Sequence, residues 1–268
     1  RRNTMRRNLE LRHKTVKFIR DYLDEQSFLD IETPILFKTT PEGARDYLVP
    51  SRVHPGHFYA LPQSPQQLKQ MLMVAGVERY FQIARCFRDE DQRGDRQPEF
   101  TQLDLEMSFV EREDIMQLAE GMFTAMVEKV TPEKKVFQTP WPRFTYQESM
   151  ERFGKDNPDI RFGLELVNVG DLVAECGFGV FENAIKADNE VRAINAKGLG
   201  DYSRKKIDAL TAYVKENSKA KGLAYIALTS EGQIRSSFAK FLTEDVRDAL
   251  IKRLDAQSGD LLLFVADQ

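Results

Sequence analysis

Apolar residues recur every three or four positions in two long segments of the first half of the chain, residues 9–26 and 113–130. This period predicts two amphipathic helices, each with one face turned toward a core. A shorter segment, 66–75, predicts a third helix, and Gly76 follows it where a left-handed residue commonly ends a helix. The methionines of the second long segment continue its apolar stripe, so we interpret them as core residues.

Between the predicted helices over 66–75 and 113–130, apolar residues recur with the period of two that is typical of strands. Residues 80–87 and 100–109 predict two strands joined by a charged loop. The second strand alternates, so that Gln102, Asp104 and Glu106 share one face. Because buried carboxylates need partners, this face predicts a site for a phosphorylated, partly cationic substrate; the alternative is a solvated edge hairpin. The loop carries three arginines, whose planar groups suit phosphate and carboxylate: Arg88, Arg93 and Arg96.

The pattern changes after residues 131–142, which hold three prolines and break the regular periods. We therefore expect a domain boundary near Arg143. Beyond it, Thr145 and Glu148 match a capping box, and the helix that they open should end at Gly154. The remaining pattern predicts a small α+β module with antiparallel strands. Its elements are strands over 191–195, 223–228 and 261–265 and helices that begin after Ser203 and Thr243.

The composition indicates the general class of protein but says little about its function. The chain has 268 residues, of which 41% are hydrophobic and 30% charged, and a formal net charge of −3. These values are ordinary for a soluble globular protein and argue against a general nucleic-acid coat. No apolar run reaches membrane-spanning length and no signal-peptide pattern opens the chain, so we expect a cytoplasmic protein. Cys86 and Cys176 lack a metal-binding spacing, and we expect no metal site and no tightly bound cofactor.

The order of residues in the charged hairpin carries a more specific signal than its charge. Phe87-Arg88-Asp89-Glu90, a variable loop and then Phe100 resemble motif 2 of the class II aminoacyl-tRNA synthetases. The run over 96–104 is similar to the version found in their aspartate, asparagine and lysine branch, class IIb. Upstream, the first helix and a short strand over 28–34, stopped by Pro34, resemble motif 1, which implies a homodimer with Pro34 at its interface.

The resemblance implies that the hairpin binds ATP, with Mg²⁺ accompanying the nucleotide. Arg88 matches the arginine that bridges the α-phosphate of ATP and the carboxylate of the amino acid. Glu90 and Gln97 match positions that contact the nucleotide, and Phe100 would stack on adenine. To promote attack of a carboxylate on the α-phosphate, the protein needs mainly to position the two groups in line and to stabilise their charge.

The resemblance also implies a pocket for L-aspartate. Lys69 matches the lysine that binds the side-chain carboxylate of the substrate. Asp104 would orient either Lys69 or the α-ammonium, and the sequence leaves both open. A full charge on aspartate would pair with Lys69, whereas asparagine would leave that ammonium poorly paired. Three residues match family positions near the α-ammonium: Glu42 in the loop over 40–46, Ser64 and Gln66.

The resemblance covers nearly the whole chain and implies an α+β fold. Residues 1–143 would form part of the antiparallel sheet flanked by helices that class II synthetases share. Residues 144–268 would form a smaller α+β insertion domain, since 153–161 looks like the start of the module that bacterial-type aspartyl-tRNA synthetases share with subunits of tRNA-dependent amidotransferases. Residues 198–204 superficially resemble motif 3, but the helix after them is too polar to match, so we expect motif 3 to be missing. The first helix resembles the linker that follows the anticodon-binding barrel, so we expect the barrel to be missing as well.

We therefore expect a part of an aspartate–tRNA ligase that holds motifs 1 and 2. The parent protein would activate aspartate with ATP and pass it to tRNA, and we expect the chain alone not to turn over. Two alternatives stay open: a relative specific for asparagine or lysine, and a non-catalytic amino-acid-binding or regulatory module derived from such a synthetase. The reading frame beyond Gln268 would distinguish the ligase from the module.

Overall fold

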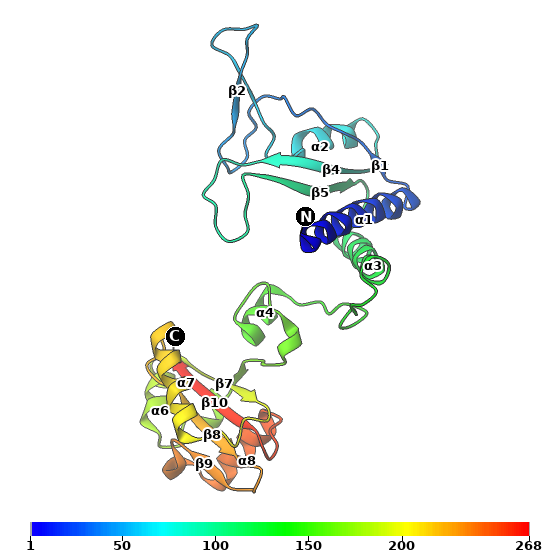
Figure 1. The fold of residues 1–268 in the computed structure, drawn as a ribbon. Coiled ribbons are helices and arrows are strands. Elements are labelled where there is room, and N and C mark those ends of the chain that lie inside the picture. The colour runs from blue at the N-terminus through cyan, green and yellow to red at the C-terminus, as the bar shows by residue number, and fades with distance from the viewer. Residues whose placement is uncertain (1, 268) are drawn as a thin grey trace. The chain divides into compact units, whose positions relative to one another are not determined.

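The computed structural model describes residues 2–267 and divides into two compact units. Unit 1 is Arg1–Trp141 and unit 2 is Pro142–Gln268, which run from blue to green and from green to red in Figure 1. The division falls two residues before the boundary expected from the prolines. Among the described residues, every helix is too short or too polar to cross a lipid bilayer. Each unit has its own hydrophobic core.

Unit 1 is built on a three-stranded sheet in the order β1-β4-β5. The predicted strand over 28–34 is shorter than expected, because the chain leaves the sheet after Ile31 donates its amide to Phe81. Its two residues pair parallel to β4, so the sheet is not wholly antiparallel. The predicted hairpin is present, although its second strand ends before Phe109, which is 96% exposed with a φ of 58°. The strands are β1 (Leu29–Asp30), β4 (Arg79–Phe87) and β5 (Glu99–Met107).

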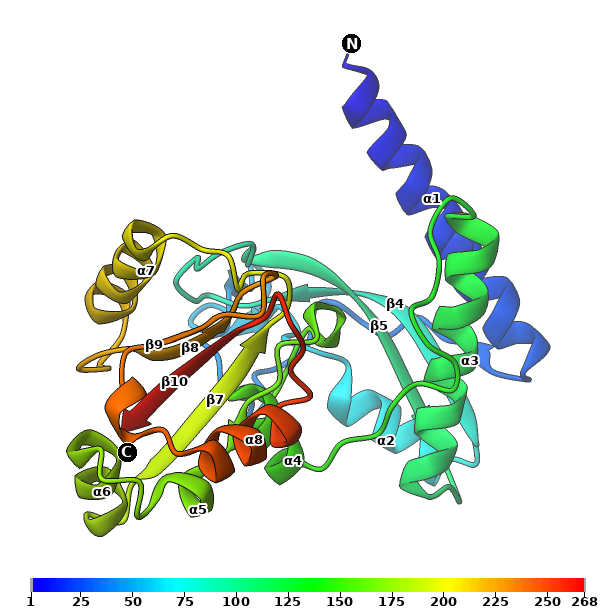
Figure 2. The same cartoon turned by 90° about the horizontal axis from the view of Figure 1, so that it is seen from below.

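Two long helices, α1 (Asn3–Glu25) and α3 (Arg112–Val130), cover one face of this sheet. They lie side by side (Figure 2). α1 begins six residues earlier than its apolar stripe predicts, because its first two turns are polar and exposed. The residues that bury this face are Ile19, Leu23, Phe28, Phe81 and Met122, with Leu103, Leu105 and Met126 packed against them.

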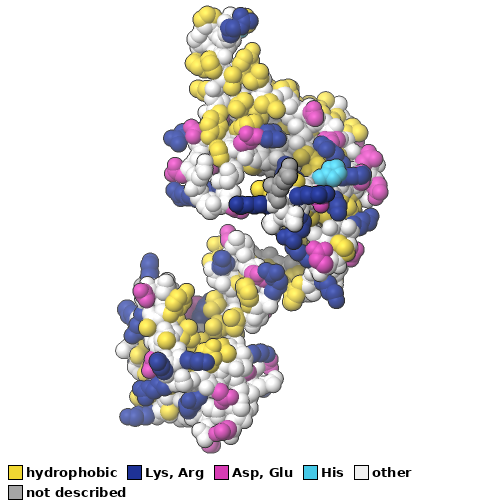
Figure 3. Space-filling model, viewed as in Figure 1, with side chains coloured by type: hydrophobic (Ala, Val, Ile, Leu, Met, Phe, Trp, Pro, Cys, Tyr) yellow, Lys and Arg dark blue, Asp and Glu magenta, His cyan; other side chains and the backbone are white. Residues whose placement is uncertain are grey.

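The opposite face of the sheet meets a short helix, α2 (Gln66–Val74), which ends as predicted, with Gly76 at a φ of 90°. A hairpin of β2 (Leu48–Pro50) and β3 (Phe58–Ala60) completes the unit and was not predicted from the sequence. Apolar side chains gather around this hairpin on the visible surface of unit 1 (Figure 3). The exposed ones include Ile35, Leu36, Leu48, Phe58 and Tyr59.

Unit 2 is an antiparallel sheet in the order β6-β7-β10-β8-β9. Its strands are β6 (Val167–Asn168), β7 (Glu190–Ala196), β8 (Ala224–Leu228), β9 (Ile234–Ser236) and β10 (Leu261–Asp267). Both faces are covered (Figure 2). One face packs against α7 (Arg204–Asn217) through Ile207. The other packs against α5 (Gly170–Val173), α6 (Gly179–Lys186) and α8 (Glu244–Arg253).

Three helix starts were predicted in unit 2, and two of them show the expected capping hydrogen bonds. Thr145 and Glu148 form the capping box of α4 (Tyr146–Phe153), and Gly154 ends that helix in the left-handed conformation. Thr243 accepts a hydrogen bond from the amide of Val246 at the start of α8. Ser203 occupies the N-cap position of α7, but its hydroxyl makes no capping hydrogen bond. Two 3₁₀ turns complete the unit, Ile160–Phe162 and Ala239–Phe241.

A buried carboxylate ties the loops at one end of this sheet. Asp260 accepts hydrogen bonds from the amides of Gly198 at 2.9 Å and Gln257 at 3.0 Å, and from the Asn195 side chain at 3.1 Å. Burial would raise the pKa of Asp260, but these hydrogen bonds outweigh it and lower the pKa below its usual value. Asp260 therefore stays ionised and holds the turn after β7 against the turn before β10.

The same end of the sheet contains a close crossing of backbone segments at Gly200. Its amide donates to the carbonyl of Gly259 at 2.7 Å, and the amide of Gly259 donates to Leu228 at 2.7 Å. A Cβ on Gly200 would lie 2.1 Å from the Leu228 oxygen and 2.7 Å from the Gly259 carbonyl carbon. Only glycine fits here, since all the crowding atoms belong to the backbone.

Candidate functional site

The polar face of the β4–β5 hairpin forms the floor of a candidate site. Because side chains alternate along a strand, the face opposite α1 and α3 carries Gln82 of β4 together with Gln102, Asp104 and Glu106 of β5. Gln82 is buried there, where its side-chain oxygen accepts from Thr33 at 3.0 Å and from Tyr80 at 2.8 Å. Across the hairpin, this face pairs Tyr80 with Glu106, Gln82 with Asp104, Ala84 with Gln102 and Cys86 with Phe100.

Lys69 reaches this floor from α2 and is only 7% exposed. Its Nζ lies 2.9 Å from Oδ1 of Asp104 and 3.2 Å from Oε2 of Glu106. Burial would lower the pKa of Lys69, but its hydrogen bonds and opposite charges with Asp104 and Glu106 outweigh this and raise the pKa. The ammonium is therefore held in its charged form. Asp104 thus contacts Lys69, which is one of the two roles that the sequence left open for it.

One oxygen of this cluster stays available. Oδ2 of Asp104 is buried and has no hydrogen-bond partner among the described residues. An ammonium has three N–H donors, and Lys69 uses two of them on Asp104 and Glu106. Counted as one ammonium and two carboxylates, the cluster carries a net charge of −1. The cluster can therefore bind a cationic group at Oδ2 of Asp104. The third N–H of Lys69 can donate a hydrogen bond to a neighbouring oxygen acceptor.

A second cluster surrounds Glu42 in the loop over 40–46. The hydroxyl of Ser64 donates to Oε2 of Glu42 at 3.0 Å, and the hydroxyl of Thr40 lies 3.3 Å from Oε1. The backbone amide of Gln66 donates in turn to the Ser64 oxygen at 3.3 Å. The three residues predicted to meet an ammonium are therefore neighbours, although Gln66 joins them through its backbone.

The thiol of Cys86, near the end of β4, is influenced by charges of both clusters and of Arg88. Cys86 is fully buried, and burial raises its pKa to about 11. The charge of Arg88 lowers this pKa, while those of Asp104 and Glu42 raise it. Arg88 lies two residues after Cys86, just beyond the end of β4. Cys86 itself is a small core residue, as its position in an apolar strand predicts.

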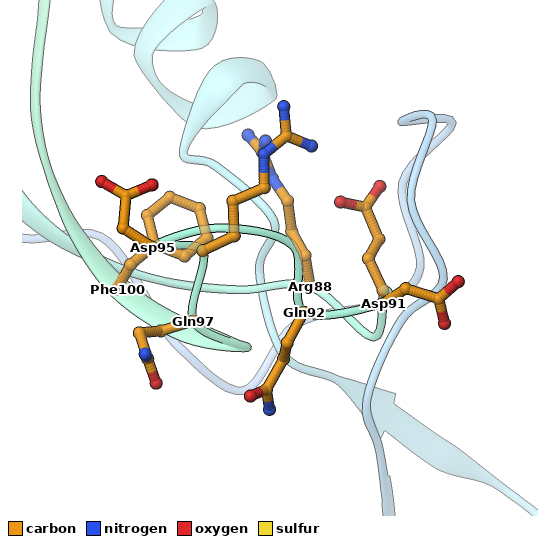
Figure 4. A pocket seen from close by; sticks show the side chains of 8 residues that line it. Arg88, Asp91, Gln92, Asp95, Gln97 and Phe100 are labelled. Atoms are coloured by element: carbon orange, nitrogen blue, oxygen red, sulfur yellow. The ribbon is translucent and has the colours of Figure 1, made fainter. Parts of the chain in front are cut away.

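Next to Arg88 the β4–β5 loop encloses a pocket of about 350 Å³. The guanidinium carbon of Arg88 lies 5.1 Å from the centre of the Phe100 ring, within cation–π range. Figure 4 shows Arg88, Gln97 and Phe100 around this hollow. Arg93 is not among the lining residues, and its side chain is 83% exposed beside Asp91. The lining consists of Arg88, Glu90, Asp91, Gln92, Asp95, Arg96, Gln97 and Phe100.

Two buried glutamines at this site, Gln63 and Gln82, were not singled out from the sequence. A glutamine in a strand or a turn is usually a surface residue, so neither position stands out in the sequence by itself. The local signal for Gln63 was its place between Pro62 and Pro65, which keeps the segment extended and stiff. Gln82 gave no such signal, because its partner Thr33 is 49 residues away in the chain.

Comparison with known families decides what kind of protein carries this site. A family described as tRNA synthetases class II (D, K and N) matches residues 1–265. This chain belongs to that class II synthetase family. The resemblance found in the motif 2 hairpin is thereby confirmed, and so is the α+β fold with antiparallel strands. The roles of single residues in the class II site remain predictions.

Bacterial relatives of this class II chain carry the names of aspartate ligases. An aspartate–tRNA(Asp/Asn) ligase of Symbiobacterium thermophilum is 60% identical over 268 residues. An aspartate–tRNA ligase of Ruminiclostridium cellulolyticum is 60% identical over 270 residues, and an aspartate–tRNA(Asp/Asn) ligase of Anoxybacillus flavithermus is 56% identical over 269 residues. Each match covers 100% of this chain and 45% of the relative. The chain thus spans somewhat less than half the length of these enzymes.

A solved structure from Leishmania major Friedlin, described as an aspartyl-tRNA synthetase, is 26% identical to this chain. It aligns with a TM-score of 0.41 over 46% of this chain and 23% of that chain. Because that alignment is partial, the family assignment rests on the sequence matches.

Proposed function

We propose that this chain carries the aspartate-binding and ATP-binding part of an aspartate–tRNA ligase. The observation that carries the proposal is the buried Lys69, charged between Asp104 and Glu106, beside an Asp104 oxygen that lacks a partner. A site of this kind holds a donor for a carboxylate and an acceptor for an ammonium at one place. L-aspartate presents both groups.

In this proposal the α-ammonium of aspartate binds between Oδ2 of Asp104 and the carboxylate of Glu42. Ser64 keeps Glu42 in place through its hydrogen bond, and the amide of Gln66 keeps Ser64 in place. The third N–H of Lys69 donates to the side-chain carboxylate of the substrate. Asparagine would offer Lys69 a neutral oxygen in place of a charged one, and hydrogen bonds between charged groups are stronger.

The reaction proposed for the whole protein begins with attack of the aspartate α-carboxylate on the α-phosphorus of ATP. A carbon–oxygen–phosphorus linkage forms, the bond to the bridging oxygen breaks, and pyrophosphate leaves. Arg88 would stabilise negative charge on both groups, while Glu90, Gln97 and Phe100 would hold the nucleotide in the pocket. The aspartyl group would then pass to the terminal hydroxyl of tRNA, releasing AMP.

Magnesium enters this proposal only as the ion that accompanies ATP. Within residues 2–267, no group of three or more His, Cys, Asp and Glu side chains could hold a metal ion. We assign no step to a resident metal ion.

Calorimetric titration of the purified chain with aspartate, asparagine and succinate tests the proposal. We expect aspartate to bind about tenfold more tightly than asparagine, the difference between a charged and a neutral hydrogen bond to Lys69. Succinate lacks the ammonium, so it should leave Glu42 and Asp104 unpaired and bind more weakly than aspartate. Equal binding of aspartate and asparagine, or no binding of aspartate, would contradict the proposed pocket.

We further infer that a second copy of the chain covers the exposed apolar surface around Pro34. Pro34, Ile35, Leu36 and Phe58 are exposed on unit 1, and large apolar side chains left exposed are often covered at an interface. Sedimentation equilibrium should give about twice the 30.9 kDa chain mass. The substitution Phe58→Lys should favour the monomer. The same change at Met71, which is 65% exposed on α2, serves as the control. A monomer at all concentrations would refute the dimer.

A further inference from the structure

Gln63 is one of the most buried polar side chains of unit 1, with 2% of its surface exposed. Its amide makes a paired contact with the backbone of Ala44. The Ala44 N–H donates to Oε1 of Gln63 at 3.0 Å, and Nε2 of Gln63 donates to the Ala44 carbonyl at 2.8 Å. Nε2 also donates to Oδ1 of Asp46, whose other oxygen accepts from the Thr39 hydroxyl. Gln63 thus satisfies three groups of one loop.

This paired contact holds the loop over 40–46 at its centre. Ala44 lies two residues after Glu42, whose carboxylate rests on the Ser64 hydroxyl. On the other side of Ala44, Arg45 forms an isolated β-bridge with Asp89, the residue after Arg88. The amide of Asp89 donates to the Arg45 carbonyl at 3.0 Å. The loop is therefore hydrogen-bonded to Asp89 of the motif 2 segment through Arg45. Through Ala44 and Glu42 it is hydrogen-bonded to Gln63 and Ser64.

The chemistry of the amide explains why glutamine suits this position. An uncharged amide both donates and accepts in one plane, so it can pair with a peptide group as a neighbouring strand would. A glutamate of the same size could accept from Ala44 but could not donate to its carbonyl. It would also place a second carboxylate against Asp46 in a buried site, which is costly.

We propose that Gln63 is a positioning residue that holds the loop over 40–46 against residues 63–64 and thereby sets the position of Glu42. The part that concerns Glu42 and aspartate rests on the proposed function, whereas the attachment of the loop to Gln63 does not. Gln63 acts through Ala44 and Asp46 and does not touch the substrate.

Exchange of the Ala44 amide hydrogen, measured by NMR on the ligand-free chain, tests the loop directly. Without the Gln63 oxygen this amide loses its acceptor, and its exchange in Gln63→Leu should be about tenfold faster, as expected for the loss of one or two hydrogen bonds. Gln70→Leu makes the same chemical change on an exposed position of α2 and should leave Ala44 unaffected. Unchanged exchange in Gln63→Leu would overturn the proposal.

A charge-exchanged pair separates positioning from simple loss of packing. Gln63→Glu should weaken aspartate binding at least tenfold and speed Ala44 exchange, since it faces Asp46 with a like charge. The double variant Gln63→Glu/Asp46→Asn restores a donor opposite the new carboxylate, and both effects should shrink. Absence of any rescue in Ala44 exchange would overturn the proposal. Unaltered aspartate affinity with a faster Ala44 would overturn the link to Glu42.

The two readouts keep the proposal apart from the proposed function. If the wild-type chain binds no aspartate, the proposed pocket fails, yet Ala44 exchange still shows whether Gln63 holds the loop. If Gln63→Leu does not fold, as judged by its amide spectrum, the comparison of Gln63→Glu with the double variant decides the matter.

Discussion

Replacing Lys69 with methionine is expected to destabilise unit 1 by about 3 kcal/mol and to weaken aspartate binding about 100-fold. Methionine keeps the length and helix propensity of the lysine but removes its charge. Asp104 and Glu106 are then left as neighbouring carboxylates without a counter-ion, and the Asp104 side chain is 12% exposed. We place the cost at the lower end of the range for a broken buried pair, because the Glu106 side chain is 31% exposed and water reaches it.

The pH dependence of this effect follows from the direction of the pKa shift. The pKa of Lys69 is raised in the folded chain, so its contribution to stability is complete below the unfolded value of about 10.4. That contribution is lost as the pH rises through the folded pKa. The wild-type chain should therefore lose stability in this alkaline range. Lys69→Met should not show this part of the loss, because it has no ammonium to titrate.

Urea unfolding followed by the fluorescence of Trp141, the single tryptophan, measures this prediction in unit 1. Lys14→Met makes the same change on an exposed position of α1 and should alter stability by less than about 0.5 kcal/mol. In titrations, Lys69→Met should lower aspartate affinity about 100-fold, which corresponds to the loss of a charged hydrogen bond. A Lys69→Met chain as stable as Lys14→Met would show that the two carboxylates do not depend on Lys69.

Gly200→Ala is expected to destabilise unit 2 by at least about 3 kcal/mol and to lower its melting temperature by about 10 °C. The added methyl group would stand 2.1 Å from the Leu228 oxygen and 2.9 Å from the Asp260 oxygen. Neither oxygen can rotate away, since both belong to the backbone of β8 and of the turn before β10. The crossing must open, and the hydrogen bonds between Gly200, Gly259 and Leu228 open with it.

Circular dichroism follows the melting of both units, whereas Trp141 reports unit 1. Gly200→Ala should shift the dichroism transition and leave the fluorescence transition in place. Gly222→Ala is the matched control, because a Cβ there meets no heavy atom within 4 Å, and its effect should be within about 1 kcal/mol of neutral. Equal melting of the two variants would mean that the crossing relaxes at little cost.

The parts of the fold that the sequence predicted well are those with a long, regular period. The strands of the β4–β5 hairpin begin within one residue of their predicted starts, and α2 begins where its pattern does. The β2–β3 hairpin was missed because each strand has three residues, too few for alternation to register. α6 was missed because it opens on Gly179, a residue that ordinarily signals a break.

For the candidate site, the sequence identified the charged side chains and missed the amides that hold them. The family resemblance left Asp104 two roles, beside Lys69 or beside the α-ammonium, and the structure places it in contact with Lys69. Gln63 could not be recognised, because its role depends on Ala44, 19 residues away, and on a loop with no regular structure. An amide can be buried only where partners satisfy its hydrogen bonds, and a single sequence does not reveal those partners.

The position of β10 in unit 2 has a consequence for the order of events during synthesis. β10 lies between β7 and β8, so before it emerges from the ribosome the sheet exists only as two separate strand pairs, β6–β7 and β8–β9. A two-stranded piece is marginally stable in water by itself. Unit 2 should therefore acquire its sheet in one late step, whereas the contiguous β4–β5 hairpin can form as soon as its own residues are free.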